Sequence, residues 1–236
     1  MTTAGTGRPA VEGLRERKKR ATRQQLSDTA ARMFLERGFD AVRVADVGEA
    51  CGVSEKTVFN YFPSKEALLL DRLEATADAL RTHLPDPALT PVGAMLTILG
   101  HELDGLATAL ATDTDQDRAL AQYRKFGDLI RSTPSLRAYL SDTVGRFVDI
   151  AAEALATRTG LRPDDPEPRI AAATLLGMWR VQFHALRTHL HPGRPLSDAI
   201  DAVACEVRRA ARLAEAGLAT FPAPIAALPP RSIKDP

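Results

Sequence analysis

The stretch "GVSEKTVFNYFPSKEAL", from Gly52 to Leu68, decides the fold of the first part of the chain. The glycine permits a sharp reversal, and Ser54 can cap the exposed amides of a following helix. The outer side of that helix carries rings and hydrogen-bond donors rather than apolar bulk. Two short helices around such a turn form a helix-turn-helix, whose second helix enters the major groove of DNA. The stretch therefore predicts a groove-binding helix over about residues 55–61.

The segments around this stretch also have helical periodicity. Upstream, Leu26, Ala30, Met33 and Phe34 recur at steps of three and four residues, and Gly38 supplies a stop signal. A short helix is expected over residues 44–51, and a longer one from Ser64, as its N-cap, to about residue 84. Apolar stripes continue through segments that begin near residues 91, 115, 134, 169 and 196. No strand pattern or internal repeat stands out, so we predict an all-α fold.

Composition suggests two domains with different partners. Residues 1–65 hold 12 Lys and Arg against 8 Asp and Glu, whereas the remaining residues hold 19 against 22. We expect a flexible arm over residues 1–13, a helix-turn-helix DNA-binding domain over 14–66, a larger helical ligand-binding and dimerisation domain over 67–218, and a flexible tail over 219–236. No apolar run approaches the roughly 20 residues of a membrane span, and no secretory signal opens the chain. We therefore expect a cytoplasmic protein.

A basic run, "RERKKRATR", precedes the helix-turn-helix and places six basic residues within Arg15–Arg23. Such a run is commonly a solvated helix end, but beside a helix-turn-helix it favours contacts to phosphates. In the second helix, donors at residues 56, 57 and 60 could reach base edges. The candidate DNA-binding residues are Lys18, Lys19, Arg20, Arg23, Arg43, Ser54, Lys56, Thr57, Asn60, Tyr61 and Lys65.

Residues 15–70 resemble the DNA-binding domain of TetR-family transcriptional regulators, on the stretch "FDAVRVADVGEACGVSEKTVFNYFPSKEALL" and the basic helix before it. Arg43 replaces the threonine of the family pattern and removes a hydroxyl cap. Gly48 replaces its alanine, which we expect to cost about 0.5–1 kcal/mol of helix propensity. Phe59 lacks the hydroxyl of the commoner tyrosine, so we expect it to be buried rather than to contact DNA. These departures from the family pattern bear on the operator sequence that the protein recognises, and not on whether it binds DNA.

The resemblance implies about nine helices, with a fourth that connects the DNA-binding part to a ligand-binding and dimerising part. It further implies a homodimeric repressor on a near-palindromic operator, released when a small-molecule effector changes the spacing of the two recognition helices. Activation instead of repression, and regulation without a ligand, both remain open at this stage. So does a protein-interaction module that keeps the fold without operator binding.

Two late helical segments suggest a dimer interface, with packing inside the chain as the alternative. The helical segments over about 169–190 and 196–218 each have an apolar stripe, and the stripe of the second is rich in small residues, which allow close helix approach. The candidate interface residues are Ile170, Thr174, Gly177, Val181, Ala199, Ile200, Val203, Val207, Ala210 and Ala214.

The chain's only tryptophan marks a possible effector pocket, with ordinary core packing as the alternative. The candidate ligand-binding residues are His101, Tyr123, Phe126, Phe147, Trp179, Arg180 and Phe183. An acyl chain, a hydrophobic metabolite and a drug-like compound all remain open as ligands.

An enzyme is the main rival class, and the sequence speaks against it. His184, His189 and His191 are not spaced to place two ligands on one helical face, and no acidic or cysteine partner is near, so we expect no metal site. No phosphate-binding glycine loop or Gly-x-Ser-x-Gly motif is present in the printed sequence. We expect neither a cofactor nor catalysis.

Overall fold

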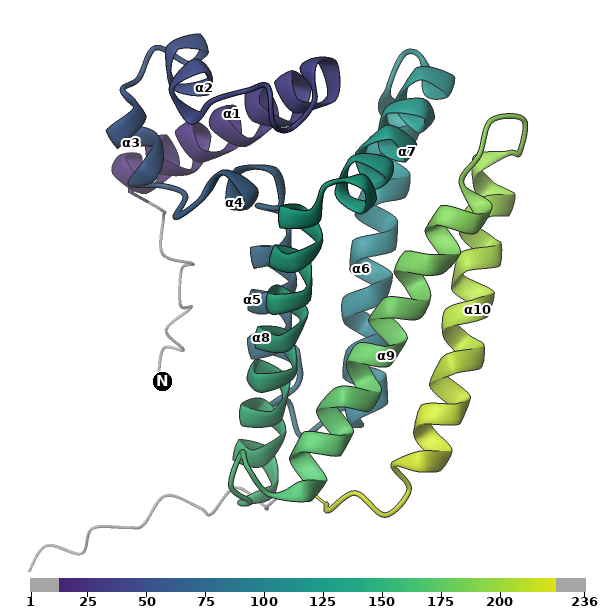
Figure 1. Cartoon of the computed structure of the whole chain (residues 1–236). Coiled ribbons are helices and arrows are strands. Elements are labelled where there is room, and N and C mark those ends of the chain that lie inside the picture. Colours follow the sequence, from purple (N-terminus) through teal and green to yellow (C-terminus); the bar gives the residue numbers. More distant parts are fainter. Residues whose placement is uncertain (1–12, 224–236) are drawn as a thin grey trace, which may run out of the picture. The chain divides into compact units, whose positions relative to one another are not determined.

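The computed structural model describes residues 13–223, which divide into two compact units between Asp71 and Arg72. Within these residues the chain forms ten helices and no strand, which confirms the all-α prediction (Figure 1). Most of the expected N-terminal arm and of the expected C-terminal tail lies outside the described range. In that range no helix combines the length and the apolar character that a membrane crossing requires.

The smaller unit contains four helices, α1 (Leu14–Arg37), α2 (Val44–Ala50), α3 (Glu55–Phe59) and α4 (Lys65–Leu69). The predicted apolar stripe of α1 points inward and packs on α2 and α4, while α3 packs on α2. The fully buried members of this core are Leu26, Ala30, Phe34, Val42, Val47, Val58, Phe62 and Leu68. Packing against α1, and of α3 against α2, thus compensates for the shortness of α2, α3 and α4, which are too short to be stable alone.

The turn between α2 and α3 depends on two glycines. Gly52 adopts a positive φ of 71°, and the Val53 amide donates to the Gly48 carbonyl oxygen at 2.9 Å. A Cβ at position 48 would lie 2.8 Å from the Val53 carbonyl oxygen. The expected propensity cost is therefore not the whole role of Gly48, because this glycine also permits the close approach of the turn to α2.

The long helix predicted from Ser64 to about residue 84 is in fact two helices. Ser64 caps α4 as predicted, since its Oγ accepts from the Ala67 amide at 3.1 Å. The helix ends at Leu69, and α5 begins at Leu73. Leu68, Leu69 and Leu70 are all buried, whereas successive residues of one helix point about 100° apart. The interruption lets three consecutive leucines reach apolar surroundings.

The larger unit contains six helices. They are α5 (Leu73–His83), α6 (Pro91–Thr112), α7 (Gln116–Ser132), α8 (Pro134–Thr159), α9 (Pro166–His189) and α10 (Leu196–Gly217). α9 packs on both α8 and α10, and α10 also packs on α6 (Figure 1). The start of α6 is fixed by Thr90, whose Oγ1 accepts from the Gly93 amide at 2.9 Å. The buried Arg158 of α8 ties down the segment after α5 by donating to the carbonyl oxygens of Leu84 and Leu89.

The packing of α10 corrects part of the predicted dimer interface. Four of its candidate residues belong to the core of the larger unit, and none of them is more than 5% exposed; they are Ala199, Val203, Val207 and Ala214. These small side chains allow α6 and α9 to approach α10 closely. For this stripe the alternative of packing within the chain is the correct one.

Candidate nucleic-acid interface and ligand cavities

The two candidate DNA-contacting regions lie together in the smaller unit. Lys18 and Lys19, from the first turns of α1, line the same hollow as Thr57, Asn60 and Tyr61, from α3 and its end. The hollow has a volume of about 410 Å³, and Arg15 and Thr22 complete its wall. Residues about 40 positions apart in sequence therefore share one surface, with cations on one side and hydrogen-bonding groups on the other.

The start of α3 is held as predicted. The Ser54 Oγ accepts from the Thr57 amide at 3.1 Å and lies 2.8 Å from the Thr57 hydroxyl. Lys56 and Asn60 are exposed on the outer side of the helix. Phe59 is also exposed, at 47%, so the expectation that it is buried is wrong. The inward position of this helix is taken by Val58, which leaves the ring of Phe59 on the outer surface.

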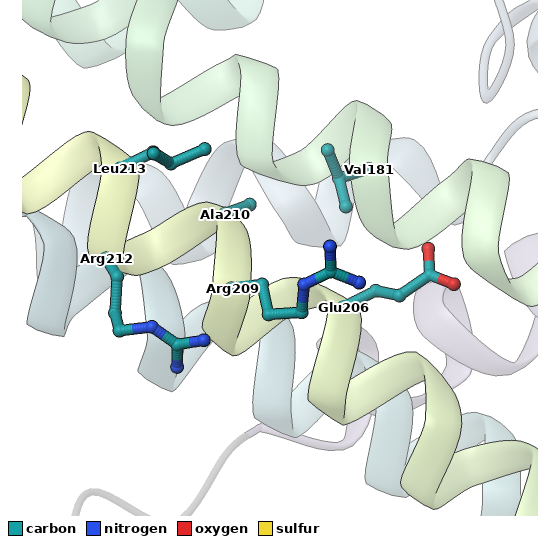
Figure 2. Close-up of a pocket in the computed structure, with 6 residues that line it drawn as sticks. All are labelled: Val181, Glu206, Arg209, Ala210, Arg212 and Leu213. Carbon is teal, nitrogen blue, oxygen red and sulfur yellow. The ribbon is translucent and has the colours of Figure 1, made fainter.

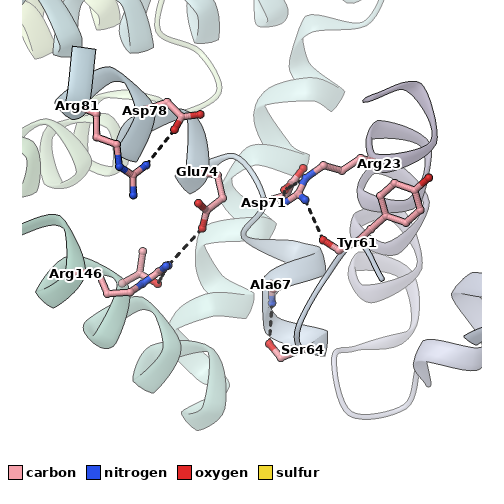
Figure 3. A network of polar contacts seen from close by, with 10 residues as sticks. Arg23, Tyr61, Ser64, Ala67, Asp71, Glu74, Asp78, Arg81 and Arg146 are labelled. Atoms are coloured by element: carbon pink, nitrogen blue, oxygen red, sulfur yellow. Dashed lines mark hydrogen bonds and ion pairs between the residues drawn. The ribbon is translucent and has the colours of Figure 1, made fainter. Parts of the chain in front are cut away.

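Arg23 and Lys65 have structural partners within the smaller unit, although both were candidates for DNA contact. The Arg23 Nε donates to Asp71 at 2.8 Å, and one of its terminal nitrogens donates to the Tyr61 carbonyl oxygen at 2.9 Å (Figure 3). Its guanidinium lies 4.7 Å from the Phe62 ring centre. The Lys65 Nζ lies 4.4 Å from the centre of the Phe39 ring. Both side chains thus position the recognition region rather than extend from it.

Arg43 lies at the start of α2 and does not line the hollow. The Asp46 carboxylate accepts from the Arg43 amide at 2.9 Å and from its guanidinium at 2.7 Å. These hydrogen bonds hold the pKa of Asp46 below its usual value and raise the pKa of Arg43. Asp46 therefore caps the amide of Arg43 itself, whereas a threonine hydroxyl at position 43 would have accepted from an amide of the first helical turn.

The basic start of α1 opposes the electrostatics of its own helix. Backbone amides give a helix N-terminus a partial positive charge, which favours acidic residues there. Here Arg15, Arg17, Lys18, Lys19 and Arg20 crowd the first two turns, and Glu16 is the acidic residue among them. This arrangement costs helix stability, and a polyanion bound at the same place would offset that cost.

The candidate ligand residues of the larger unit separate into three groups. Tyr123 and Phe126 line a hollow of about 360 Å³ between α7 and α9, and burial raises the pKa of Tyr123 to about 12. Trp179 and Arg180 line a second hollow, of about 450 Å³, between α7, α8 and α9, and Phe183 borders both. Phe147 is 1% exposed in the core, and the exposed His101 lines neither hollow, so these two predictions are wrong for the cavities described.

Glu102 is a polar residue of this region that the sequence analysis missed. It lies on α6 within an apolar stripe, accepts from the Thr76 hydroxyl at 2.6 Å and hydrogen-bonds Trp179. The Gln182 amide lies 3.4 Å from its other oxygen. Burial raises the pKa of its carboxyl, although the two hydrogen bonds act in the opposite direction. The sequence did contain a signal for this residue: Glu102 falls among Leu99, Leu103 and Leu106, which form the apolar, inward side of the helix.

The exposed side of α9 and α10 carries the rest of the predicted interface. Ile170 is 64% exposed, Gly177 is exposed, and Thr174 and Val181 are half-buried. Val181 borders a hollow of about 500 Å³ whose other lining residues come from α10: Glu206, Arg209, Ala210, Arg212 and Leu213 (Figure 2).

Leu213 is 78% exposed and was missed, because it stands outside the inward stripe of α10. Its signal in the sequence was a large apolar residue in the otherwise polar and small-residue stretch "RRAARLAEAG". Among residues 13–223 no group of three or more histidine, cysteine, aspartate or glutamate side chains could hold a metal ion.

Comparison with known proteins places both units in one family. Residues 26–71 match the family model described as bacterial regulatory proteins, tetR family, and residues 95–212 match the model described as the MftR C-terminal domain. The second match alone covers half of the chain.

Two curated relatives extend over most of the chain. TcmR, an HTH-type transcriptional regulator of Streptomyces glaucescens, is 30% identical over 77% of this chain and 82% of its own length. The protein named as a mycofactocin biosynthesis transcriptional regulator, MftR, of Mycobacterium tuberculosis is 28% identical over 69% of this chain and 78% of its own. The crystal structure of NalD, the secondary repressor of the MexAB-OprM multidrug efflux pump in Pseudomonas aeruginosa, covers 80% of this chain and 96% of that one at 18% identity, with a TM-score of 0.45.

These proteins are transcriptional regulators rather than enzymes, and the helix-turn-helix stretch from Gly52 to Leu68 lies inside the first match. The chain belongs to the TetR family of DNA-binding transcriptional regulators.

Proposed function

We propose that the chain is a homodimeric repressor that binds a near-palindromic operator in the cytoplasm and is released by a small-molecule effector. The observation that carries this proposal is the hollow shared by the start of α1 and by α3, because it joins cations to base-reading groups on one surface. The smaller unit binds DNA in this proposal, and the larger unit binds the effector and the second copy of the chain.

In the proposed complex α3 lies in the major groove. Asn60 pairs with an adenine edge and Lys56 reaches a guanine or a nearby phosphate, since these are the pairings that the groove geometry favours. The exposed ring of Phe59 contacts a thymine methyl group. Lys18 and Lys19 contact phosphates, which fix the register of the helix without reading sequence.

The second copy of the chain binds the exposed side of α9 and α10. Ile170, Val181, Ala210 and Leu213 supply apolar contact area, and Glu206 and Arg209 supply opposite charges that pair across a two-fold axis. A two-fold dimer presents its recognition helices to half-sites about 34–36 Å apart. An effector releases the operator only if it binds more tightly to a state with the wrong spacing.

The test begins with a gel shift on the DNA that flanks the protein's own gene. We expect Asn60→Ala with Lys56→Ala to abolish the specific complex. The control variant Lys125→Ala, an exposed lysine of the larger unit, should leave the complex intact. Specific binding that survives the double substitution would exclude α3 as the recognition helix and favour another use of the fold.

Dimerisation is tested by gel filtration at micromolar concentration. The wild-type protein should elute as a dimer, and Leu213→Asp should shift it to the monomer because a carboxylate would then be buried in the interface. Adding fractions of a metabolite extract to the gel shift then searches for the effector. A wild-type monomer contradicts the dimer, and a complex that resists every fraction contradicts release by a ligand.

A further inference from the structure

The hollow between α7, α8 and α9 combines an aromatic wall with a concentration of positive charge. Its volume of about 450 Å³ suits a small molecule. Trp179 and Phe183 form one side, and four arginines surround it: Arg131 from α7, Arg137 from α8, and Arg180 and Arg187 from α9. The fold gathers these arginines from three helices.

The aromatic wall is flat and partly accessible. The rings of Trp179 and Phe183 are stacked, with centres 5.8 Å apart and planes within 11° of each other. Phe147 supports Trp179 from the core through an edge contact at 6.1 Å. Trp179 is 7% exposed and Phe183 37%, so the stack offers an apolar face to the hollow while the rest of it is packed. An aromatic ring or an acyl chain would fit against such a face.

The positive charge of the hollow is only partly neutralised. Arg131 forms an ion pair with Asp128, which lies outside the lining residues. The side chains of Arg137, Arg180 and Arg187 form no ion pair or hydrogen bond with any residue of the described range 13–223. None of the lining residues is acidic, and His184 adds a further nitrogen base to the wall. The arginines therefore repel one another without a protein counter-charge in the hollow.

We propose that this hollow binds an organic anion, namely a carboxylate attached to an apolar body such as an aromatic ring or an acyl chain. The inference rests on the proposed function, in which an effector binds the larger unit, and it names the chemical class of that effector. Guanidinium groups bind carboxylates through paired hydrogen bonds, while the apolar body lies on the Trp179 and Phe183 rings. A neutral or cationic compound of the same shape would leave the arginines without their counter-charge.

Trp179 allows a direct test, because it is the only tryptophan of the chain and lies in the wall of the hollow. Its fluorescence is titrated with 4-phenylbutyrate and octanoate, and with 4-phenylbutan-1-ol and octan-1-ol as neutral partners of matched length. We expect each carboxylate to bind about 10-fold or more tightly than its alcohol, since its hydrogen bonds to arginine are charge-assisted. Comparing the two phenyl compounds with the two octyl compounds shows whether the hollow prefers an aromatic ring or an acyl chain.

Substitution of single arginines then shows which positive charges bind the carboxylate. Arg137→Gln and Arg187→Gln should each weaken carboxylate binding about 10-fold and leave alcohol binding within two-fold. The matched control is Arg208→Gln, an exposed arginine of α10 that does not line the hollow; it should leave both affinities unchanged. Circular dichroism of each variant checks that the fold is retained, which is expected because all three side chains are exposed.

Three results would overturn the proposal: equal affinity for carboxylates and alcohols, an equal loss in Arg208→Gln, or no fluorescence change with any probe. Operator binding, measured without ligand, separates this proposal from the general one. A protein that binds its operator but no carboxylate keeps its role as a regulator and refutes the ligand class. A protein that binds carboxylates without any change in operator affinity keeps the ligand site and refutes release by this class of effector.

Discussion

The two units of the chain place their charged side chains in opposite ways. The smaller unit keeps its basic residues outside, in a contiguous run at the start of α1, and its core is almost wholly apolar. The larger unit takes Glu102 and the buried Arg158 into its helix packing, and exposed arginines from three helices surround an aromatic wall. An open basic surface suits a long polyanion with many equivalent phosphates, whereas a walled hollow suits one small anion.

The largest expected effect separates the two sets of cations. Lys18→Gln with Lys19→Gln should weaken operator binding roughly 30-fold at about 0.15 M salt, since each phosphate contact contributes on the order of 1 kcal/mol there. The slope of log affinity against log salt should fall in magnitude by about 2. Fluorescence anisotropy with a labelled operator measures both quantities.

The reciprocal variant completes this experiment. Arg137→Gln with Arg187→Gln should leave operator affinity within two-fold in the absence of ligand, while the lysine variant should keep the wild-type response of Trp179 to carboxylates. If both double variants lose operator affinity to the same degree, the distinction between an outer polyanion surface and a small-anion cavity is wrong, and the arginines belong to the DNA interface.

A smaller effect is expected from packing in the turn of the smaller unit. Gly48→Ala gains about 0.5–1 kcal/mol of helix propensity. Its Cβ would meet the Val53 carbonyl oxygen at 2.8 Å, and backbone atoms cannot move aside cheaply. Overpacking typically costs about 1–3 kcal/mol, so the net effect should be a destabilisation of about 1–2 kcal/mol, measured by urea unfolding with circular dichroism.

Gly105 offers a matched control in the larger unit. It is an exposed glycine inside α6, and a Cβ there would meet nothing within 4 Å. Gly105→Ala should therefore stabilise the protein by about 0.5–1 kcal/mol through propensity alone. Equal stabilisation by both alanines would show that the turn relaxes around position 48 and that the glycine is not required for packing.

The sequence was most informative where function depends on residues close together in the chain. The turn glycine and the Ser54 cap follow from spacing over a few residues, and both are found in the structure. The break between α4 and α5 was missed, because the residues from Ser64 to about 84 have a continuous helical pattern. That pattern does not show that Leu68, Leu69 and Leu70 will all be buried. Lys65 illustrates the same limit: its sequence position suggests phosphate contact, but the Phe39 ring that it packs against lies 26 positions earlier.

The cavities of the larger unit could not be derived in this way. Arg131, Arg137 and Arg187 are ordinary surface cations in sequence, and only the packing of α7, α8 and α9 brings them to one hollow. The inward stripe of α10 was recognised from its period, but period alone does not distinguish a core-facing stripe from a partner-facing one. Leu213 and Ile170 indicate which side could face a partner, because these two residues remain exposed after the core has formed.

The smallest expected effect concerns Glu102, the carboxyl that distinguishes the interior of the larger unit from that of the smaller one. Burial raises the pKa of this carboxyl above the ordinary value of 4.5, so the folded protein retains its proton to a higher pH than the unfolded chain does. The stability that the protonated carboxyl contributes is therefore complete below about pH 4.5 and is lost as the pH rises through the folded-state pKa.

Glu102→Gln replaces the carboxyl with a neutral group of the same shape, which can still accept a hydrogen bond from Thr76 or Trp179. The variant should gain stability relative to the wild type as the pH rises from 4 to 7, by up to about 1 kcal/mol, the scale of one interior hydrogen bond. Urea unfolding followed by Trp179 fluorescence at several pH values measures this difference. Asp104→Asn, at an exposed position of the same helix, should stay within about 0.5 kcal/mol of the wild type throughout. A Gln variant whose stability relative to the wild type is the same at pH 4 and pH 7 would mean that folding does not raise the pKa of Glu102, and one that loses relative stability as the pH rises would mean that Glu102 is held as a stabilised anion.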